Sequence, residues 1–455
     1  MPSPQIATAA TTATTVSPRP GRRSTRAPYT LPAARRASPV AHLRIRHLGE
    51  VLRSLRDHGA QSRTELCETL GLSATTLSKL VAELLGGGWL TEGEVRRQRD
   101  VGRPHTALAL VPQACRLASV VVEPDALHVG VAGLDARLDP IHSAPVAFSQ
   151  AHTEPSQPVP AMAHRKLDAA PPAGRVQPAV SASLDRIARA ILDAQRAERA
   201  AGRAPLRAVS LALPGLTDTR LRTLLRSDQI GWYDLALADA LESRTGLPVL
   251  VHNNTRAMAF AEFRHLGLDE EQPMLFVQAR FGLGAAMVNS ARASRHGHFG
   301  ASDLGHIPLG LNAFASQVPT DRRLVSVTNE AYLCAVLGIP AAGEPVLPLL
   351  EARRAAGDPA ACALYTQTLD NLATGLGIAV DILCPRTIVL GGIYALASDG
   401  FADDLKARLA GRAQAELLRG LSVRRSALGL QGALQGAALV GLDHLLADPA
   451  TFRGD

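Results

Sequence analysis

Residues 62–88 read SRTELCETLGLSATTLSKLVAELLGGG and carry the clearest fold signal in the chain. Ser62 followed three residues later by Glu65 is a capping box, which starts a short helix that Gly71 ends. Ser73 caps a second helix, and a run of three glycines stops it. The apolar positions of this second helix have the spacing of one helical face: Leu77, Leu80, Val81 and Leu84. The stretch therefore predicts two helices joined by a glycine turn.

The flanking sequence extends this pair of helices into a small domain. Between residues 43 and 56, apolar residues recur at helical spacing, which predicts a helix before the pair. After the pair, residues 89–91 and 106–110 are short apolar runs around a charged, glycine-containing loop, which predicts a hairpin. Such an order is typical of a winged helix-turn-helix, so we expect a DNA-binding domain over residues 41–111.

The second helix of the pair and the hairpin loop carry groups that suit DNA recognition. Opposite the apolar stripe lie small polar and cationic residues, which can approach bases and phosphates closely. The loop contains Gly102-Arg103-Pro104, an extended segment that suits the narrow minor groove of A/T-rich DNA. The predicted DNA-contacting residues are Ser73, Ala74, Thr75, Ser78, Lys79, Arg96, Arg97 and Arg103. The alternative interpretation is an ordinary three-helix core with solvated polar faces.

The length of the chain and the distribution of its charge indicate how it is divided into domains. Its 455 residues exceed one core at roughly 100–200 residues per domain, so we expect two or three domains. The formal net charge is +7, and residues 1–40 hold six arginines and no acid, so most of the basicity lies in this tail. Its Ala, Thr, Ser and Pro content predicts disorder. The tail is either a basic arm that touches DNA phosphates or a solvated extension.

The cysteines and the apolar runs indicate the cellular location of the protein. The five cysteines lie far apart with no C-x-x-C pair, which argues against a disulfide framework and a cysteine zinc site. No stretch has the ~18 uninterrupted apolar residues of a membrane span, and residues 1–40 contain no signal-peptide core. We therefore expect a cytoplasmic protein with no membrane partner.

Residues 112–455 alternate predicted strands with predicted helices. Strands are expected at 117–122, 126–133, 208–213, 249–251 and 387–390, and helices at 181–200, from 256 onward and at 369–383. A hairpin is expected around residues 281–284, and the Pro- and Ala-rich residues 151–180 are expected to be a loop insertion. Polar or glycine turns follow several strands, so we expect an α/β domain with its site at the carboxyl ends of the strands.

Several short motifs stand in a recognisable order along this larger part. They are Leu213-Pro214-Gly215, Gly231-Trp232, Asn253, Gly282-Leu283-Gly284, Leu304-Gly305-His306 and Gly391-Gly392. Together with the winged helix, their order resembles the ROK family, which comprises bacterial sugar kinases and transcriptional regulators of the same fold. The resemblance covers residues 42–445. It implies two actin-like, ribonuclease H-like α/β lobes with a central cleft.

The chain departs from the kinases of this family in two places. The resemblance implies an Asp-x-Gly-Gly-Thr turn that cradles ATP phosphates, but residues 122–126 read VEPDA and supply no glycine. Backbone N–H groups reach a phosphate only where the turn is open, and Pro124 has no N–H to donate. The family's catalytic aspartate is replaced by Asn254, whose amide cannot take a proton from a sugar hydroxyl. We therefore expect no enzyme activity.

The zinc site that the resemblance implies is also incomplete. His306 stands at one ligand position, but residues 310–328 contain no cysteine. One histidine cannot form the four-ligand site that zinc prefers, so we expect no metal and no cofactor. His306 is then either a ligand contact or a satisfied buried histidine.

The resemblance also implies a ligand site. Carried over by position, its residues are Asn253, Asn254, Asp303, His306 and Glu330. Amides and a carboxylate suit the hydroxyl groups of a sugar, which need both donors and acceptors. Nearby Arg256 could pair with Asp303, recognise a carboxylate or phosphate of the ligand, or form a surface ion pair.

These observations favour a DNA-binding transcriptional regulator, expected to be a repressor, whose non-catalytic body binds a sugar or sugar-phosphate effector. One winged helix binds weakly and palindromic operators match two-fold symmetry, so we expect a homodimer or homotetramer on double-stranded DNA. Two alternatives stay open. One is a ROK sugar kinase with an appended DNA-binding domain, and the other is a regulator whose body is only an oligomerisation platform.

Overall fold

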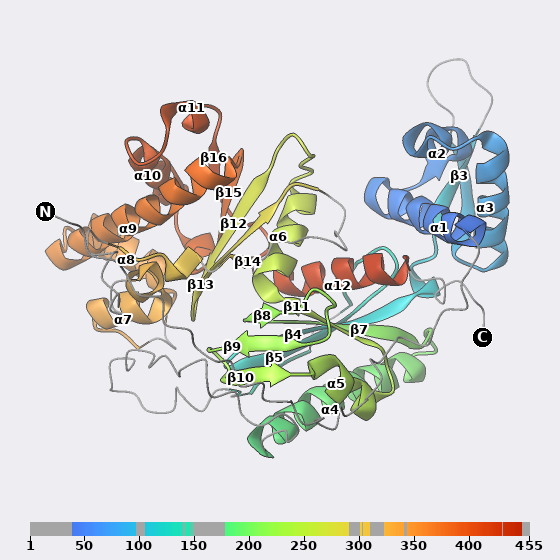
Figure 1. The fold of residues 1–455 in the computed structure, drawn as a ribbon, viewed down its shortest axis with the longest axis horizontal. Helices are drawn as coiled ribbons and strands as arrows, with labels where there is room; N and C mark the ends of the chain where they lie inside the picture. The colour runs from blue at the N-terminus through green and yellow to red at the C-terminus, as the bar shows by residue number, and fades with distance from the viewer. Residues whose placement is uncertain are drawn as a thin grey trace, which may run out of the picture.

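The computed structural model describes residues 39–96, 105–139, 142–146, 148, 178–290, 301–302, 304–309, 323–340, 344–429 and 431–447. Within them the chain forms a small N-terminal unit and two larger α/β lobes (Figure 1). Residues 1–38 of the predicted tail and 151–177 of the predicted insertion lie outside the described residues. In the described part, no helix has the length and apolar character needed to cross a membrane.

The N-terminal unit has three helices and a three-stranded sheet of order β1-β3-β2. Its elements are α1 (Pro39–His58), β1 (Gln61–Ser62), α2 (Arg63–Leu70), α3 (Ala74–Gly86), β2 (Leu90–Arg96) and β3 (His105–Leu110). Ser62 and Glu65 form the predicted capping box, in which each side chain accepts the other residue's backbone N–H. Gly71 ends α2 in the left-handed conformation (φ 64°), and Ser73 caps α3. The two helices and their turn are thus confirmed.

The first lobe is built on a five-stranded sheet of order β11-β7-β4-β5-β6. Its strands are β4 (Arg116–Val122), β5 (Ala126–Ala132), β6 (His142–Pro145), β7 (Leu206–Leu213) and β11 (Val249–Asn253). Strands β4, β7 and β11 are parallel, so their carboxyl ends meet at one edge of the sheet. Helices α4 (Pro178–Ala200) and α5 (Leu237–Thr245) cover one face with an apolar core.

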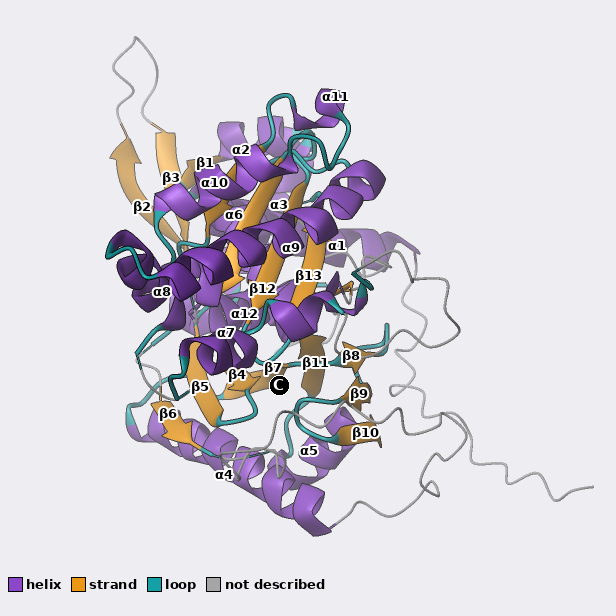
Figure 2. Ribbon diagram, turned by 90° about the vertical axis from the view of Figure 1, so that its left-hand side faces the viewer, coloured by secondary structure: helices purple, strands orange, loops and turns teal. Residues whose placement is uncertain are grey.

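A small three-stranded sheet extends the first lobe beside β11 (Figure 2). Its strands are β8 (Leu216–Thr217), β9 (Leu224–Ser227) and β10 (Trp232–Leu235), and it follows the Pro-Gly turn at the end of β7. The sequence patterns did not predict these short strands.

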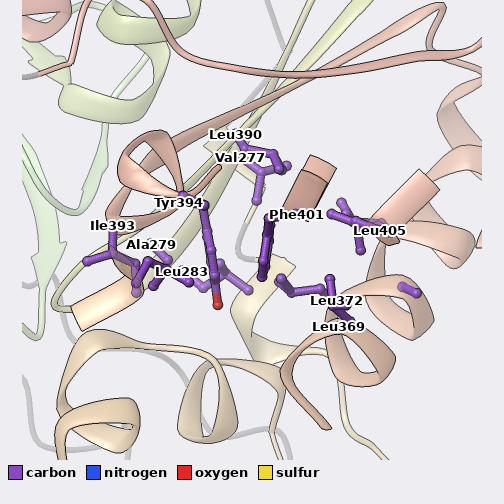
Figure 3. Close-up of a cluster of buried hydrophobic side chains, with 14 of the residues drawn as sticks. Val277, Ala279, Leu283, Leu369, Leu372, Leu390, Ile393, Tyr394, Phe401 and Leu405 are labelled. Carbon is purple, nitrogen blue, oxygen red and sulfur yellow. The ribbon is translucent and has the colours of Figure 1, made fainter. Parts of the chain in front are cut away.

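The second lobe has a five-stranded sheet of order β14-β13-β12-β15-β16. Its strands are β12 (Met274–Ala279), β13 (Leu283–Val288), β14 (Ala301–Ser302), β15 (Thr387–Gly392) and β16 (Ser422–Arg425). Its helices are α7 (Glu330–Leu337), α8 (Val346–Ala355), α9 (Pro359–Leu383), α10 (Asp399–Leu409) and α11 (Ala415–Leu418). In the core between sheet and helices, the rings of Tyr394 and Phe401 stack with centroids 5.6 Å apart (Figure 3).

Helices α6 (Asn254–His265) and α12 (Gln431–Leu445) lie between the two sheets (Figure 1). The hydroxyls of Ser119 on β4 and Ser210 on β7 each donate a 2.6 Å hydrogen bond to a backbone carbonyl of α12. A β-carbon at Gly436 of α12 would overlap the carbonyl oxygen of Ala257 on α6. The two helices therefore touch backbone to backbone and join the lobes through one core.

Several predicted boundaries differ from the structure. Helix α1 begins at Pro39, inside the predicted tail, and strand β2 runs to Arg96 instead of ending at residue 91. Helix α4 begins at Pro178, inside the predicted insertion, and α9 begins at Pro359 rather than at residue 369. The start of α9 is set by Asp358, whose carboxylate accepts the N–H groups of Ala360 and Ala361, and the small residues after it hide the helical period. Strand β13 already begins at Leu283, so the hairpin turn is tighter than predicted.

Candidate functional site

The exposed face of α3 presents the predicted DNA-contacting residues. Leu77, Leu80 and Val81 are buried, so the stripe faces inward as predicted. The side chains on the other side are exposed: Ser73, Ala74, Thr75, Ser78 and Lys79. The small residues among them leave the backbone of this helix open to a close approach by a partner.

The arginines of the hairpin are only partly described. Arg96 is the last residue of β2 and pairs with His105 of β3 across the hairpin. Arg97 and Arg103 lie outside the described residues, as does the side chain of Arg96. Their contacts with DNA stay a prediction.

Asn253 stands at the carboxyl end of β11, and its amide is engaged within the protein. Its Nδ2 donates to the carbonyl oxygen of Gly215 (2.7 Å), and its Oδ1 accepts the N–H of Arg256 (3.0 Å) as the N-cap of α6. Gly215 has a positive φ of 125°, and a β-carbon there would overlap the Arg226 carbonyl oxygen. Asn253 therefore fixes the Pro-Gly turn against the start of α6. The predicted contact of Asn253 with a ligand would come in addition to this structural role.

Asn254 is the residue that the family resemblance sets at the position of the kinases' catalytic base. It is 9% exposed, and its Oδ1 accepts the N–H of Thr255 at 2.8 Å. An amide has no proton affinity comparable with a carboxylate, so this position can bind a hydroxyl but cannot deprotonate it.

Three residues join the two lobes at the place where the nucleotide turn was expected. Arg280, just after β12 of the second lobe, pairs with both Glu123 and Asp125 of the turn between β4 and β5 in the first lobe. The Arg280–Asp125 distance is 3.0 Å. We call Arg280, Glu123 and Asp125 the interlobe clasp. The clasp fills this corner with a guanidinium that the protein itself supplies.

The charges of the clasp shift the neighbouring carboxyl groups in opposite directions. Burial by itself would raise the pKa of Glu123, but His128 and Arg280 outweigh burial and lower it. Burial raises the pKa of Glu330, and the charges of Asp125 and Glu123 add to this while Arg280 opposes it. Three carboxyl groups thus surround one guanidinium, an arrangement that disfavours a phosphate.

Glu330 belongs to the clasp region more than to the end of β11. It is the first residue of α7, and its N–H donates to the carbonyl oxygen of Arg280 at 3.2 Å. The structure therefore places Glu330 beside the interlobe clasp, and Asn253 and Asn254 at the start of α6.

His306 is exposed, so its interpretation as a buried histidine is wrong. Its Nδ1 lies 2.6 Å from Nη1 of Arg323. On the first lobe, Asp228 accepts hydrogen bonds from Arg226 (2.8 Å) and Tyr233 (3.1 Å). Burial would raise the pKa of Asp228, but Arg226, Tyr233 and the charge of His306 lower it.

Sequence patterns missed two charged residues at the boundary between the lobes, Asp228 and Arg280. Asp228 lies just before the Gly231-Trp232 motif and Arg280 just before the Gly282-Leu283-Gly284 motif, so proximity to the motifs was the available signal. Asp303 lies outside the described residues, and so does any pairing with Arg256. Burial lowers the pKa of Arg256.

His306 is the candidate metal ligand. Within the described ranges, no three His, Cys, Asp or Glu side chains come close enough together to hold a metal ion. The expected absence of a metal stays a prediction.

His252 is a buried histidine directly before Asn253. It is 5% exposed, its Nε2 has no hydrogen-bond partner, and its ring lies 6.4 Å from that of His444 on α12. Burial, and then the charges of His444 and Arg256, lower the pKa of His252 to about 3. The end of β11 therefore holds a neutral imidazole in the folded protein.

Comparison with known proteins places this geometry in one family. The family model described as the ROK family matches residues 175–443. The DNA-binding transcriptional repressor Mlc of Escherichia coli is 21% identical over 414 residues, which cover 88% of this chain and 94% of Mlc. A glucokinase of Halalkalibacterium halodurans is 28% identical over 251 residues, which cover 51% of this chain and 75% of that enzyme. For some curated relatives the matched part is only 64% of their length.

A solved structure shows the same fold over nearly the whole chain. It is that of a ROK family transcriptional regulator, a homologue of the E. coli Mlc protein, with a TM-score of 0.68 and 21% identity. The similarity covers 90% of this chain and 98% of the other.

The buried His252 predicts a specific pH dependence of stability. The unfolded chain binds a proton near the usual pKa of about 6.5, whereas the folded chain resists it until about pH 3, so stability falls as pH falls through this window. Between pH 6 and pH 5, His252→Gln should lose roughly 1 kcal/mol less unfolding free energy than the wild type. Urea unfolding at several pH values measures this. The exposed His265→Gln variant is the control and should follow the wild-type slope. Parallel curves for His252→Gln and wild type would contradict the assignment.

Proposed function

The chain belongs to the ROK family, and on this premise we propose that it is a DNA-binding transcriptional repressor whose kinase-like body binds a ligand without phosphorylating it. The observation that carries the proposal is the N-terminal unit, with its capped helices α2 and α3 and the exposed polar face of α3. We interpret this unit as a winged helix-turn-helix, with α3 as the recognition helix and the β2–β3 hairpin as the wing. The likeness to the repressor Mlc extends over 88% of the chain and supports this interpretation.

Substitutions in α3 and in the wing test DNA binding. Lys79→Ala should weaken binding of the DNA upstream of the gene and lower the salt slope by about one unit, because one phosphate contact is lost. Arg103→Ala should reduce the preference for A/T-rich flanks. Fluorescence anisotropy at several salt concentrations measures both. Lys406→Ala, an exposed lysine on α10 of the second lobe, is the matched control and should bind like the wild type. Wild-type affinity in both test variants would refute the interpretation.

The cleft supports a body without phosphoryl transfer. The clasp occupies the turn at which the family resemblance implies the ATP phosphates, and Asn254 stands where it implies the catalytic base. The alternative is a sugar kinase with an appended DNA-binding domain. It would need other residues to bind the ATP phosphates and to act as the base. Asp228 of the first lobe accepts hydrogen bonds from Arg226 and Tyr233.

A coupled assay with ATP, magnesium and a panel of hexoses tests this part. We expect no turnover above the buffer rate, and we expect Asn254→Asp to leave the rate unchanged, because the phosphate turn would still be absent. A bacterial glucokinase run in parallel shows that the assay works. Turnover that disappears in Asn254→Ala would make the protein a kinase.

We propose that the ligand is a sugar or a sugar derivative bound between the lobes by Asn253, Asn254, Asp303 and His306, with Glu330 at the clasp end. Three carboxyl groups near Arg280 favour a neutral sugar over a sugar phosphate. A homodimer or homotetramer would present two winged helices to a palindromic operator.

Thermal unfolding with sugars and sugar phosphates tests ligand binding. A true ligand at 100 times its Kd should stabilise the protein by about 2.7 kcal/mol, and His306→Ala should reduce the shift. His265→Ala, exposed on the far end of α6, is the control and should keep the full shift. A panel with no shift would favour the alternative, in which the body is only an oligomerisation platform.

A further inference from the structure

Helix α6 reaches from the cleft to the N-terminal unit. Its first turn starts at Asn253 and Asn254, and the Thr255 hydroxyl lies 3.4 Å from Oε1 of Gln278 on β12 of the second lobe. Its last turn carries Arg264, whose guanidinium pairs with the carboxylate of Asp57 on α1. The helix has 12 residues, so at about 1.5 Å per residue it is a rod of about 18 Å.

The contact at Asp57 continues into a chain of buried charges. The side chain of Arg56 is 2% exposed and pairs with Asp57 at 2.9 Å and with Asp443 of α12 at 2.8 Å. Burial would lower the pKa of Arg56, but the two carboxylates hold it above its usual value. A charge away from water is costly unless it is paired, so these pairs define where α1 sits on α6 and α12.

Apolar contacts fix the same junction. Leu52 of α1 shares one core with Phe260 of α6 and Leu442 of α12. A β-carbon at Gly49 would overlap the carbonyl oxygen of Leu446, so the backbone of α1 lies close to the end of α12. The N-terminal unit therefore follows any shift of α6 and α12, since the packed interior does not absorb the movement.

At the other end of α6, the clasp joins the two lobes. Arg280 joins the second lobe to Glu123 and Asp125 of the first, and the start of α6 lies between the same two lobes. The link between clasp and helix is Gln278, two residues before Arg280, which lies 3.4 Å from the Thr255 hydroxyl in the first turn of α6.

Resting on the function proposed above, we propose that α6 carries the state of the cleft to the DNA-binding unit, with the Asp57–Arg264 pair as the positioning contact at its far end. Ligand binding between the lobes displaces α6, and Arg264 then moves α1 and the attached recognition helix. The coupling is a free energy shared by two sites, so it can be measured from either end.

A double-mutant cycle tests this without a known effector. Arg280→Gln opens the clasp, and Asp57→Asn removes the junction pair. The readout is the Kd for a labelled duplex from the region upstream of this gene. We expect Arg280→Gln to change that Kd at least about five-fold alone and less than about two-fold in the Asp57→Asn background. Arg264→Gln, which breaks the pair from the other side, should suppress the response equally, and Asp57→Glu, which keeps the charge, should restore it.

Arg244→Gln provides the matched control for the cycle. It breaks the 2.7 Å ion pair of Arg244 with Asp185, which joins α5 to α4 away from the junction. In this background the five-fold response to Arg280→Gln should remain. Melting curves of all variants confirm that each is folded before its Kd is compared.

Hydrogen exchange of α1 gives a second readout that needs no DNA. Arg280→Gln should change the exchange of residues 43–58 in the wild-type background and leave it unchanged in Asp57→Asn. An equal response in both backgrounds, or no response in the wild type, overturns the relay. If the wild type binds no DNA while exchange in α1 still follows the clasp, the proposed function fails and the relay stands.

Discussion

A backbone contact between two helices holds this protein together. Gly436 of α12 lies against the carbonyl group of Ala257 on α6, with no room for a side chain between them. From this contact, α12 accepts hydrogen bonds from Ser119 and Ser210 of the first sheet, and α6 packs on the second. A close-packed interior moves as a body instead of deforming, so the position of this helix pair decides how the lobes and the N-terminal unit lie relative to each other.

The ion pairs of Arg280 are a second constraint on how the two lobes lie. A site that holds a nucleotide needs backbone donors for its phosphates, whereas this chain places Arg280 between two carboxylates of the opposite lobe. The guanidinium satisfies those carboxylates and at the same time ties the lobes together. The same fold can thus serve catalysis or regulation. The difference is whether this turn is open to the phosphates of a nucleotide or is closed by ion pairs within the protein.

The features that could be predicted from the sequence are local ones. The capping box at Ser62 and the turn at Gly71 depend on hydrogen bonds and φ angles within a few residues, and both are present as predicted. Contacts between distant residues left no such pattern: Arg280 and Glu123 are 157 positions apart, and Arg264 and Asp57 are 207 apart. In the candidate site, the motifs led to the end of β11, but Asp228 comes from a turn between two short strands that no periodicity announces.

The shared core of α1 has a consequence for how such a protein can evolve. Its inner face packs on α6 and on the last turns of α12, about four hundred residues later in the chain. Residues 41–111 are therefore not an interchangeable module, although their sequence resembles one. A recombination that exchanged them alone would set a foreign helix against Leu442 and Leu446 and leave Asp443 buried without its arginine. The N-terminal unit can therefore be exchanged only together with α12, so two segments far apart in the sequence must change together.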